Sequence, residues 1–130
     1  MLASYEGGCH CGQVRFRVQG DLDDVSVCNC SICTQKGIIH LVVPREHFEL
    51  LRGADAIATY TFGTGVAKHT FCRHCGIHSF YTPRSRPDGF SVNVRCLEGV
   101  DLASLHPSLF DGQHWEEFMA TRRASSQALP

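Results

Sequence analysis

The sequence predicts one mainly β domain whose short strands are organised around bound metal. Several short runs alternate apolar and polar residues or are rich in β-branched residues. Helical patterns appear only near the end of the chain. Most of the 8 cysteines fall into three tight clusters, which indicates metal ligands where the N-terminal residues show no pattern of a secretory signal. Together these features favour a zinc-organised β domain.

The first strands follow from side-chain alternation. Residues 13–19 place Val14, Phe16 and Val18 on one face and predict a half-buried strand. Residues 38–44 are β-branched and predict a more fully buried strand that Pro44 closes. Residues 46–53 are ambiguous and end at Gly53.

The later elements surround a cysteine pair. Residues 56–63 and 66–71 flank a GTG turn, which predicts a hairpin that leads directly into that pair. Residues 77–83 and 90–96 predict two more strands, with a proline- and glycine-containing loop over 83–89. Short helical turns are expected at 101–105, capped by Asp101, and at 114–119. We expect one domain over residues 1–119 and a loose tail over 120–130.

Composition excludes several classes of protein. The chain has 130 residues, of which 12 are basic and 13 are acidic, so a dedicated nucleic-acid binder with a basic surplus is not expected. No apolar run approaches the ~20 residues that span a bilayer. The N-terminus has no basic region followed by a long apolar segment, which favours a cytoplasmic or nuclear location. Exposed strand edges allow a homodimer.

Two of the cysteine clusters are half-sites of one structural zinc. Cys72 and Cys75 in FCRHCG wrap a tight turn, and Cys9 and Cys11 in GGCHCG are also flanked by glycine. Two pairs of sulfurs complete a tetrahedral four-cysteine site. This pairing would join the N-terminal segment to the hairpin.

The third cluster supplies three sulfurs. Cys28, Cys30 and Cys33 in CNCSIC leave one position of a second zinc free for water or a thiol, as in a catalytic site. Spacing alone is about equally compatible with Cys96 or a histidine as a fourth ligand, and it also permits a different mixing of the clusters. An iron–sulfur cluster fits the spacing poorly. A zinc ribbon that binds nucleic acid is disfavoured by the charge balance.

Other residues have simpler interpretations. His10 and His74 are expected to face solvent, and His40 and His78 fit strand patterns as hydrogen-bonded strand residues. His69 lies three residues before Cys72 and can approach a metal. A positive group that assists a bound thiolate can come from Lys68, His69, Arg84 or Arg86; Cys96 is expected to be a small buried residue.

The segments GGCHCGQVRF, CNCSIC and HTFCRHCG resemble the glutathione-dependent formaldehyde-activating enzyme family. The stretch over residues 50–89 resembles the branch typified by centromere protein V, and the resemblance runs from about residue 5 to about residue 119. It implies a β-tent-like fold of small antiparallel sheets around zinc. It also implies that Cys9, Cys11, Cys72 and Cys75 hold the structural zinc, and that Cys28, Cys30 and Cys33 hold an exchangeable zinc.

The resemblance further implies a carbon–sulfur lyase-type activity on a thiol–aldehyde adduct, such as that of glutathione with formaldehyde. The sequence departs from the family at Asn29 and Thr34, where histidine and arginine are frequent. We expect Asn29, His69 and Arg84 to contact the substrate. Two other classes remain open: a non-catalytic zinc module for a protein or chromatin partner, and a hydrolase or lyase for another small electrophile.

Overall fold

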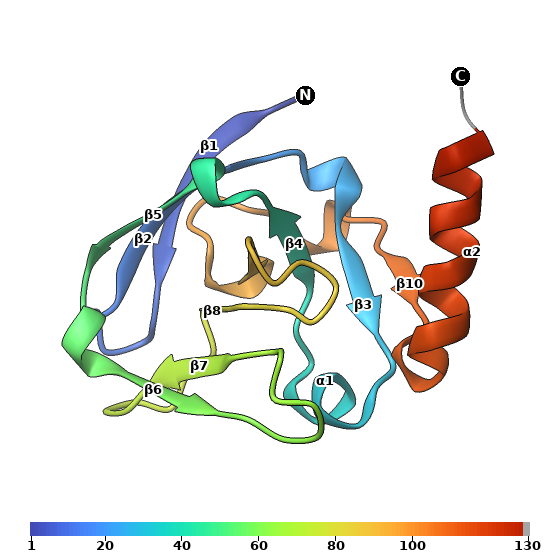
Figure 1. Cartoon of the computed structure of the whole chain (residues 1–130). Coiled ribbons are helices and arrows are strands. Elements are labelled where there is room, and N and C mark those ends of the chain that lie inside the picture. The colour runs from blue at the N-terminus through green and yellow to red at the C-terminus, as the bar shows by residue number, and fades with distance from the viewer. Residues whose placement is uncertain (129–130) are drawn as a thin grey trace.

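The computed structural model describes residues 1–128, with the side chains of residues 1–122. In that part of the chain, strands form a three-stranded sheet, a five-stranded sheet and a two-stranded hairpin (Figure 1). Short 3-10 turns connect them: η1 (Leu22–Asp24), η2 (Arg45–His47), η3 (Ala54–Ala56), η4 (Val94–Cys96), η5 (Leu102–Ser104) and η6 (Gly112–His114). The predicted class, mainly β with small antiparallel sheets, is confirmed.

The three-stranded sheet contains β1 (Ala3–Gly8), β2 (Arg15–Gly20) and β5 (Phe48–Arg52), with antiparallel neighbours. The alternation predicted for residues 13–19 is confirmed, because Val14, Phe16 and Val18 are 1%, 0% and 0% exposed. The ambiguous segment 46–53 divides into the end of η2 and β5. Strand β1 was not predicted from the sequence.

The five-stranded sheet has the order β10 (Ser108–Phe110), β3 (Ser26–Cys28), β4 (His40–Val43), β9 (Phe90–Asn93) and β8 (Phe80–Tyr81). Strands β10 and β3 pair in parallel, whereas the other neighbours are antiparallel. Strand β4 lies within the predicted 38–44 strand and is buried except at Val42, which is 38% exposed. The predicted strand over 77–83 contracts to two residues.

The predicted hairpin is confirmed. Strand β6 (Ile57–Tyr60) pairs with β7 (His69–Cys72) in an antiparallel register that places Tyr60 opposite His69. Strand β7 therefore presents His69 at one end and Cys72 at the other. Of these two residues, only Cys72 belongs to a cysteine cluster.

Side chains of the two larger sheets share one apolar core. Phe16 packs against Phe48 with ring centroids 5.5 Å apart, and Phe48 packs against Phe80 and Phe90 at 4.8 Å and 4.3 Å. Burial of a phenylalanine side chain contributes about 1.5–3 kcal/mol relative to exposure. The aromatic cluster therefore fixes the relative position of the two sheets, which carry the cysteine-bearing loops.

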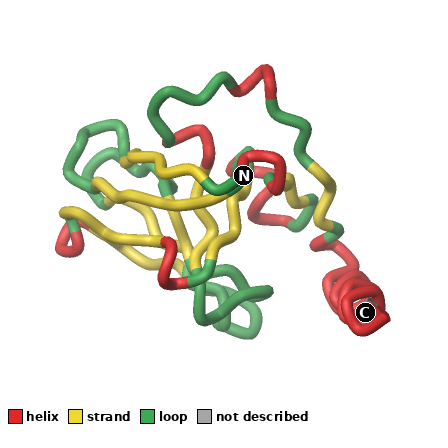
Figure 2. Tube along the Cα trace, turned by 90° about the horizontal axis from the view of Figure 1, so that it is seen from above, coloured by secondary structure: helices red, strands yellow, loops and turns green. Residues whose placement is uncertain are grey.

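Two α-helices complete the described chain. Helix α1 (Ser31–Lys36) follows β3, and α2 (Trp115–Ala128) stands to one side of the sheets (Figure 2). The sequence analysis expected a short turn at 114–119; the structure instead continues one helix from Trp115 to Ala128. Acidic residues in its first turn stabilise the helix through a favourable interaction with the helix dipole. The loose tail expected over residues 120–130 stays a prediction. Residues 129–130 of the predicted tail lie outside the described residues, and the boundary at residue 119 stays a prediction.

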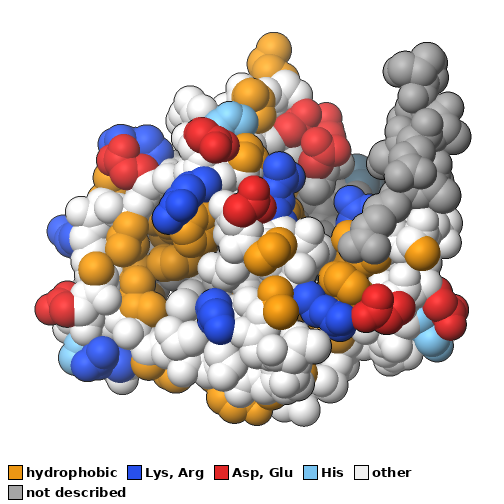
Figure 3. All heavy atoms as spheres, in the orientation of Figure 1, with side chains coloured by type: hydrophobic (Ala, Val, Ile, Leu, Met, Phe, Trp, Pro, Cys, Tyr) orange, Lys and Arg blue, Asp and Glu red, His pale blue; other side chains and the backbone are white. Residues whose placement is uncertain are grey.

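The predicted turn at 101–105 is confirmed as η5, where the Asp101 side chain accepts a hydrogen bond from the Ala103 backbone N–H at 3.1 Å. None of the helices in the described residues is long and apolar enough to cross a bilayer. On the face shown in Figure 3, acidic and basic side chains are interspersed. That face therefore carries no broad patch of one charge.

Candidate metal centres and the adjoining cavity

The first metal cluster joins the β1–β2 turn to the end of β7. Cys9 and Cys11 lie in that turn, and Cys72 and Cys75 lie at the other half-site. The sulfur of Cys11 is 3.6 Å from that of Cys9 and 3.7 Å from that of Cys72. A tetrahedron with sulfurs ~2.3 Å from zinc has edges of about 3.8 Å. The four sulfurs therefore fit a tetrahedral metal site and are too far apart for disulfides.

Matching glycine turns bring these sulfurs together. Gly12 and Gly76 follow the second cysteine of each pair with φ values of 81° and 78°, a conformation that favours glycine. The backbone N–H of Gly76 donates to the Cys72 carbonyl at 2.8 Å. The N–H of Val14 donates to the Cys9 sulfur at 3.3 Å, which disperses negative charge on a metal-bound thiolate.

The second cluster lies where β3 passes into α1. Cys28 ends β3, Cys30 is the N-cap of α1, and Cys33 lies in that helix. The Cys33 N–H donates to the Cys30 sulfur at 3.4 Å. Gly37 ends the helix with a left-handed φ of 68°. A six-residue helix is short, so its capping groups largely determine that it forms.

The three sulfurs of this cluster lie within 4.8 Å of one another. Among the residues that the structure describes, no histidine, carboxylate or further cysteine joins them. Cys96 and His69 therefore stand outside the cluster, which offers three protein ligands to a metal ion. The thiols of Cys28 and Cys33 hold the pKa of Cys30 at about 2, so Cys30 is the first of the three to ionise.

A C-terminal strap, defined as residues 110–115, covers the second cluster from one side. The Asn29 side-chain N–H donates to the Asp111 carboxylate at 3.0 Å, and the Gln113 N–H donates to the Asn29 side-chain oxygen at 3.0 Å. Asn29 is absent from the cavity wall. Both ends of the Asn29 amide bind the strap, and the expectation that Asn29 contacts the substrate stays a prediction.

Gly112 brings the strap close to Cys28 and Cys30 of the second cluster. A Cβ atom at this position would lie 2.6 Å from the Cys28 sulfur and 2.8 Å from the Cys30 Cβ. A residue other than glycine therefore cannot occupy this position unless the strap or the cysteines move. Sequence reasoning missed this residue because Gly112 lies about 80 residues from the cluster that it contacts.

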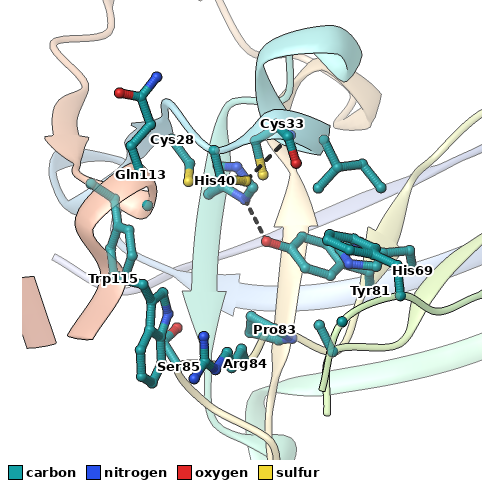
Figure 4. Close-up of a pocket in the computed structure, with 18 of the residues that line it drawn as sticks. Cys28, Cys33, His40, His69, Tyr81, Pro83, Arg84, Ser85, Gln113 and Trp115 are labelled. Atoms are coloured by element: carbon teal, nitrogen blue, oxygen red, sulfur yellow. Dashed lines mark hydrogen bonds between the residues drawn. The ribbon is translucent and has the colours of Figure 1, made fainter. Parts of the chain in front are cut away.

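The second cluster opens into a cavity of about 520 Å³, the size of a typical small-molecule site. Figure 4 shows Cys28 and Cys33 at one end, with Trp115 and Arg84 along one wall and Tyr81 and His69 along another. The structure thus places two of the three expected substrate residues, His69 and Arg84, in the wall. Trp115 and Tyr81 were not singled out for this role from the sequence.

Arg84 supplies a cation to the cavity. Its guanidinium lies 3.7 Å from the centre of the Trp115 ring and donates to the Glu116 carboxylate at 2.7 Å. Stacking on the indole fixes the plane of the guanidinium. The arrangement suits recognition of a carboxylate at the end of the cavity away from the sulfurs.

His40 is a further residue of the wall that the sequence analysis treated as an ordinary strand histidine. Its Nδ1 lies 2.9 Å from the Ser91 hydroxyl and 3.3 Å from that of Tyr81. Its Nε2 is buried without a hydrogen-bond partner, contrary to the expected fully bonded strand histidine. Burial lowers the pKa of His40 to about 4 and raises that of Tyr81. Both groups are therefore uncharged at neutral pH.

Comparison with known proteins gives two findings. Residues 4–116 match the sequence model of the family described as glutathione-dependent formaldehyde-activating enzyme. The crystal structure of a Rhodobacter sphaeroides protein is similar, with 39% sequence identity and a TM-score of 0.75. The similarity covers 80% of this chain and 97% of that chain.

Proposed function

The chain belongs to the glutathione-dependent formaldehyde-activating enzyme family, and on that basis we propose that it is a zinc enzyme of carbon–sulfur lyase type. Its substrate is an adduct of a small thiol with an aldehyde, such as that of glutathione with formaldehyde. The observation that carries the proposal is the three-sulfur cluster, without a fourth protein ligand among the described residues, at one end of a cavity of about 520 Å³. A purely structural zinc site needs neither an open position nor a cavity.

Both cysteine clusters fit zinc. Thiolate ligands at tetrahedral spacing select zinc among the common divalent ions. Cys9, Cys11, Cys72 and Cys75 would hold the structural ion, and Cys28, Cys30 and Cys33 the second ion. A zinc ion at the second cluster supplies an open position that favours the ionised form of a thiol.

The chain's own residues orient the other parts of the substrate. The reaction joins a thiol sulfur to the aldehyde carbon; the carbonyl π electrons move to oxygen, which takes a proton equivalent to the one that the thiol loses. Arg84 faces the cavity as a partner for a substrate carboxylate. The aromatic walls of Tyr81 and Trp115 limit the access of water. In the reverse reaction the carbon–sulfur bond breaks, and the thiol and the aldehyde leave the same cavity.

The test is exchange between glutathione, formaldehyde and their adduct, followed by NMR magnetisation transfer, together with the zinc content by native mass spectrometry. Cys30→Ser should lose one zinc and the catalysed exchange. Cys96→Ser is the matched control, since Cys96 belongs to neither cluster, and should retain two zinc ions and the exchange. A Cys30→Ser variant that still catalyses exchange overturns the proposal. Two zinc ions that resist chelation equally, without catalysed exchange, would instead support the non-catalytic module.

Location in the cytoplasm and assembly as a homodimer stay predictions. Gel filtration of the zinc-loaded protein decides the second. The family indicates a glutathione-related small molecule as the partner. Which thiol or aldehyde the chain prefers is decided by the exchange assay with alternative substrates.

A further inference from the structure

The side chain of His69 is held rigidly in the cavity wall. Its ring stacks between Phe62 and Tyr81, with centroid distances of 5.3 Å and 5.2 Å and interplanar angles of 21° and 16°. The residue is only 4% exposed and lines the cavity. Two stacked neighbours leave the ring little freedom to rotate, so its two nitrogens have fixed surroundings.

One of these nitrogens meets Lys36. The Lys36 ammonium lies 3.3 Å from His69 Nδ1 and 5.5 Å from the centre of the Tyr81 ring. Lys36 is the last residue of α1, the helix that carries Cys33. A lysine ammonium has three donors and no acceptor, so Nδ1 must accept. The proton of the neutral ring then resides on Nε2.

The other nitrogen faces the cavity. Within the described residues, His69 Nε2 has no hydrogen-bond partner, and it is not one of the nitrogens enclosed by protein atoms. Burial, followed by the nearby charge of Lys36, lowers the pKa of His69 to about 4. A lysine ammonium ordinarily loses its proton about three units above neutral pH, so it is charged at neutral pH. Burial lowers the pKa of Lys36, and the thiols of Cys33 and Cys30 oppose that shift.

We propose that Lys36 is a positioning residue that holds His69 in the Nε2–H tautomer, so that His69 gives the cavity an uncharged donor for the oxygen of the thiol–aldehyde adduct. The inference rests on the proposed function for the identity of that oxygen. Negative charge develops on the oxygen when sulfur adds to the carbonyl carbon. A donor that is already oriented stabilises this charge without reorganisation and without giving up its own proton.

The tautomer can be observed directly. Two-bond ¹H–¹⁵N correlation spectra of the full zinc-loaded protein distinguish protonated from unprotonated imidazole nitrogens. We expect His69 to show a protonated Nε2 in the wild type and a substantial Nδ1–H population in Lys36→Met. Lys36→Arg should restore the wild-type pattern, because arginine also only donates. Lys68→Met is the matched control: its ammonium donates to the Gly65 carbonyl, and the tautomer should not change.

A protonated Nδ1 in the wild type, or an unchanged tautomer in Lys36→Met, overturns the inference. Zinc content and thermal unfolding of each variant report whether the fold is retained. If Lys36→Met unfolds, the tautomer of His69 is compared between Lys36→Arg and the wild type. The exchange assay gives the second readout. We expect Lys36→Met to lower kcat by about tenfold to a hundredfold with little change in KM for the thiol.

The two proposals can fail separately. A wild type that catalyses no thiol–aldehyde exchange overturns the proposed function, whereas the tautomer spectra still decide the role of Lys36. If the tautomer of His69 changes in Lys36→Met but kcat does not fall, the proposed role of His69 as a donor in the reaction is overturned. Rescue of both readouts by Lys36→Arg supports the inference.

Discussion

Gly112→Ala tests whether close contact between the C-terminal strap and the second cluster holds the three sulfurs in place. The new Cβ would lie 2.6 Å from the Cys28 sulfur and 2.8 Å from the Cys30 Cβ. Non-bonded carbon atoms rest about 3.5–4.0 Å apart, so one partner must move by about 1 Å. Overpacking of this kind lowers the free energy of unfolding by about 1–3 kcal/mol.

The effect on metal binding follows from the same displacement. Metal sites tolerate errors of only about 0.2 Å in ligand distances. If the cysteines move, the three sulfurs no longer fit one ion; if the strap moves, the hydrogen bonds of Asn29 to Asp111 and Gln113 break. We expect zinc affinity at the second cluster to fall by about tenfold to a hundredfold, the range for supporting residues of metal sites. The four-cysteine site should keep its ion.

The assay is zinc release to a chromogenic chelator. We expect a fast phase from the three-cysteine cluster and a slow phase from the four-cysteine cluster. Gly112→Ala should accelerate the fast phase and leave the slow phase unchanged. Gly99→Ala is the control: Gly99 has a φ of 74° and open space around its Cβ position. That variant is strained by about 1–2 kcal/mol but touches neither cluster. If Gly112→Ala releases zinc at the wild-type rate, the contact does not support the site.

Two further variants address the cavity. Arg84→Met should raise KM for glutathione by about tenfold, because one carboxylate loses its guanidinium partner; KM for a thiol without carboxylates should stay unchanged, and equal effects on both thiols would contradict the assignment. For His40, the folded pKa of about 4 lies below the ordinary value of 6.5, so the folded chain binds fewer protons and loses stability as pH falls from 6.5 towards 4. This loss amounts to about 3 kcal/mol; urea unfolding of His40→Gln over that range should show a correspondingly smaller loss than the wild type, and equal losses would refute it.

The cysteine clusters were predictable because local spacing limits where sulfurs can point. Glycine-flanked pairs at Cys9/Cys11 and Cys72/Cys75 each present two sulfurs to one centre, and the structure groups them as expected. The alternation of Val14, Phe16 and Val18 likewise predicts burial on one face, which is observed. Both inferences depend only on neighbours in the chain.

The parts that were missed depend on distant segments. Strand β10 forms because it pairs with β3, and Gly112 matters because that pairing carries it onto Cys28. Neither segment contains a local signal for the contact. The hydrogen bonds of Asn29 were missed for the same reason: its partners, Asp111 and Gln113, become neighbours only after the sheet has formed.

Strand β10 pairs in parallel with β3, so the second cluster cannot be covered until β10 has been synthesised. All four sulfurs of the four-cysteine site have been synthesised once Cys75 is reached, whereas Gly112 follows 37 residues later, the difference between those two positions. At ~5–20 residues per second, that interval lasts several seconds. The N-terminal scaffold can therefore acquire its ion before residues 110–115 close over the second cluster, so a segment made late in translation completes the cavity wall.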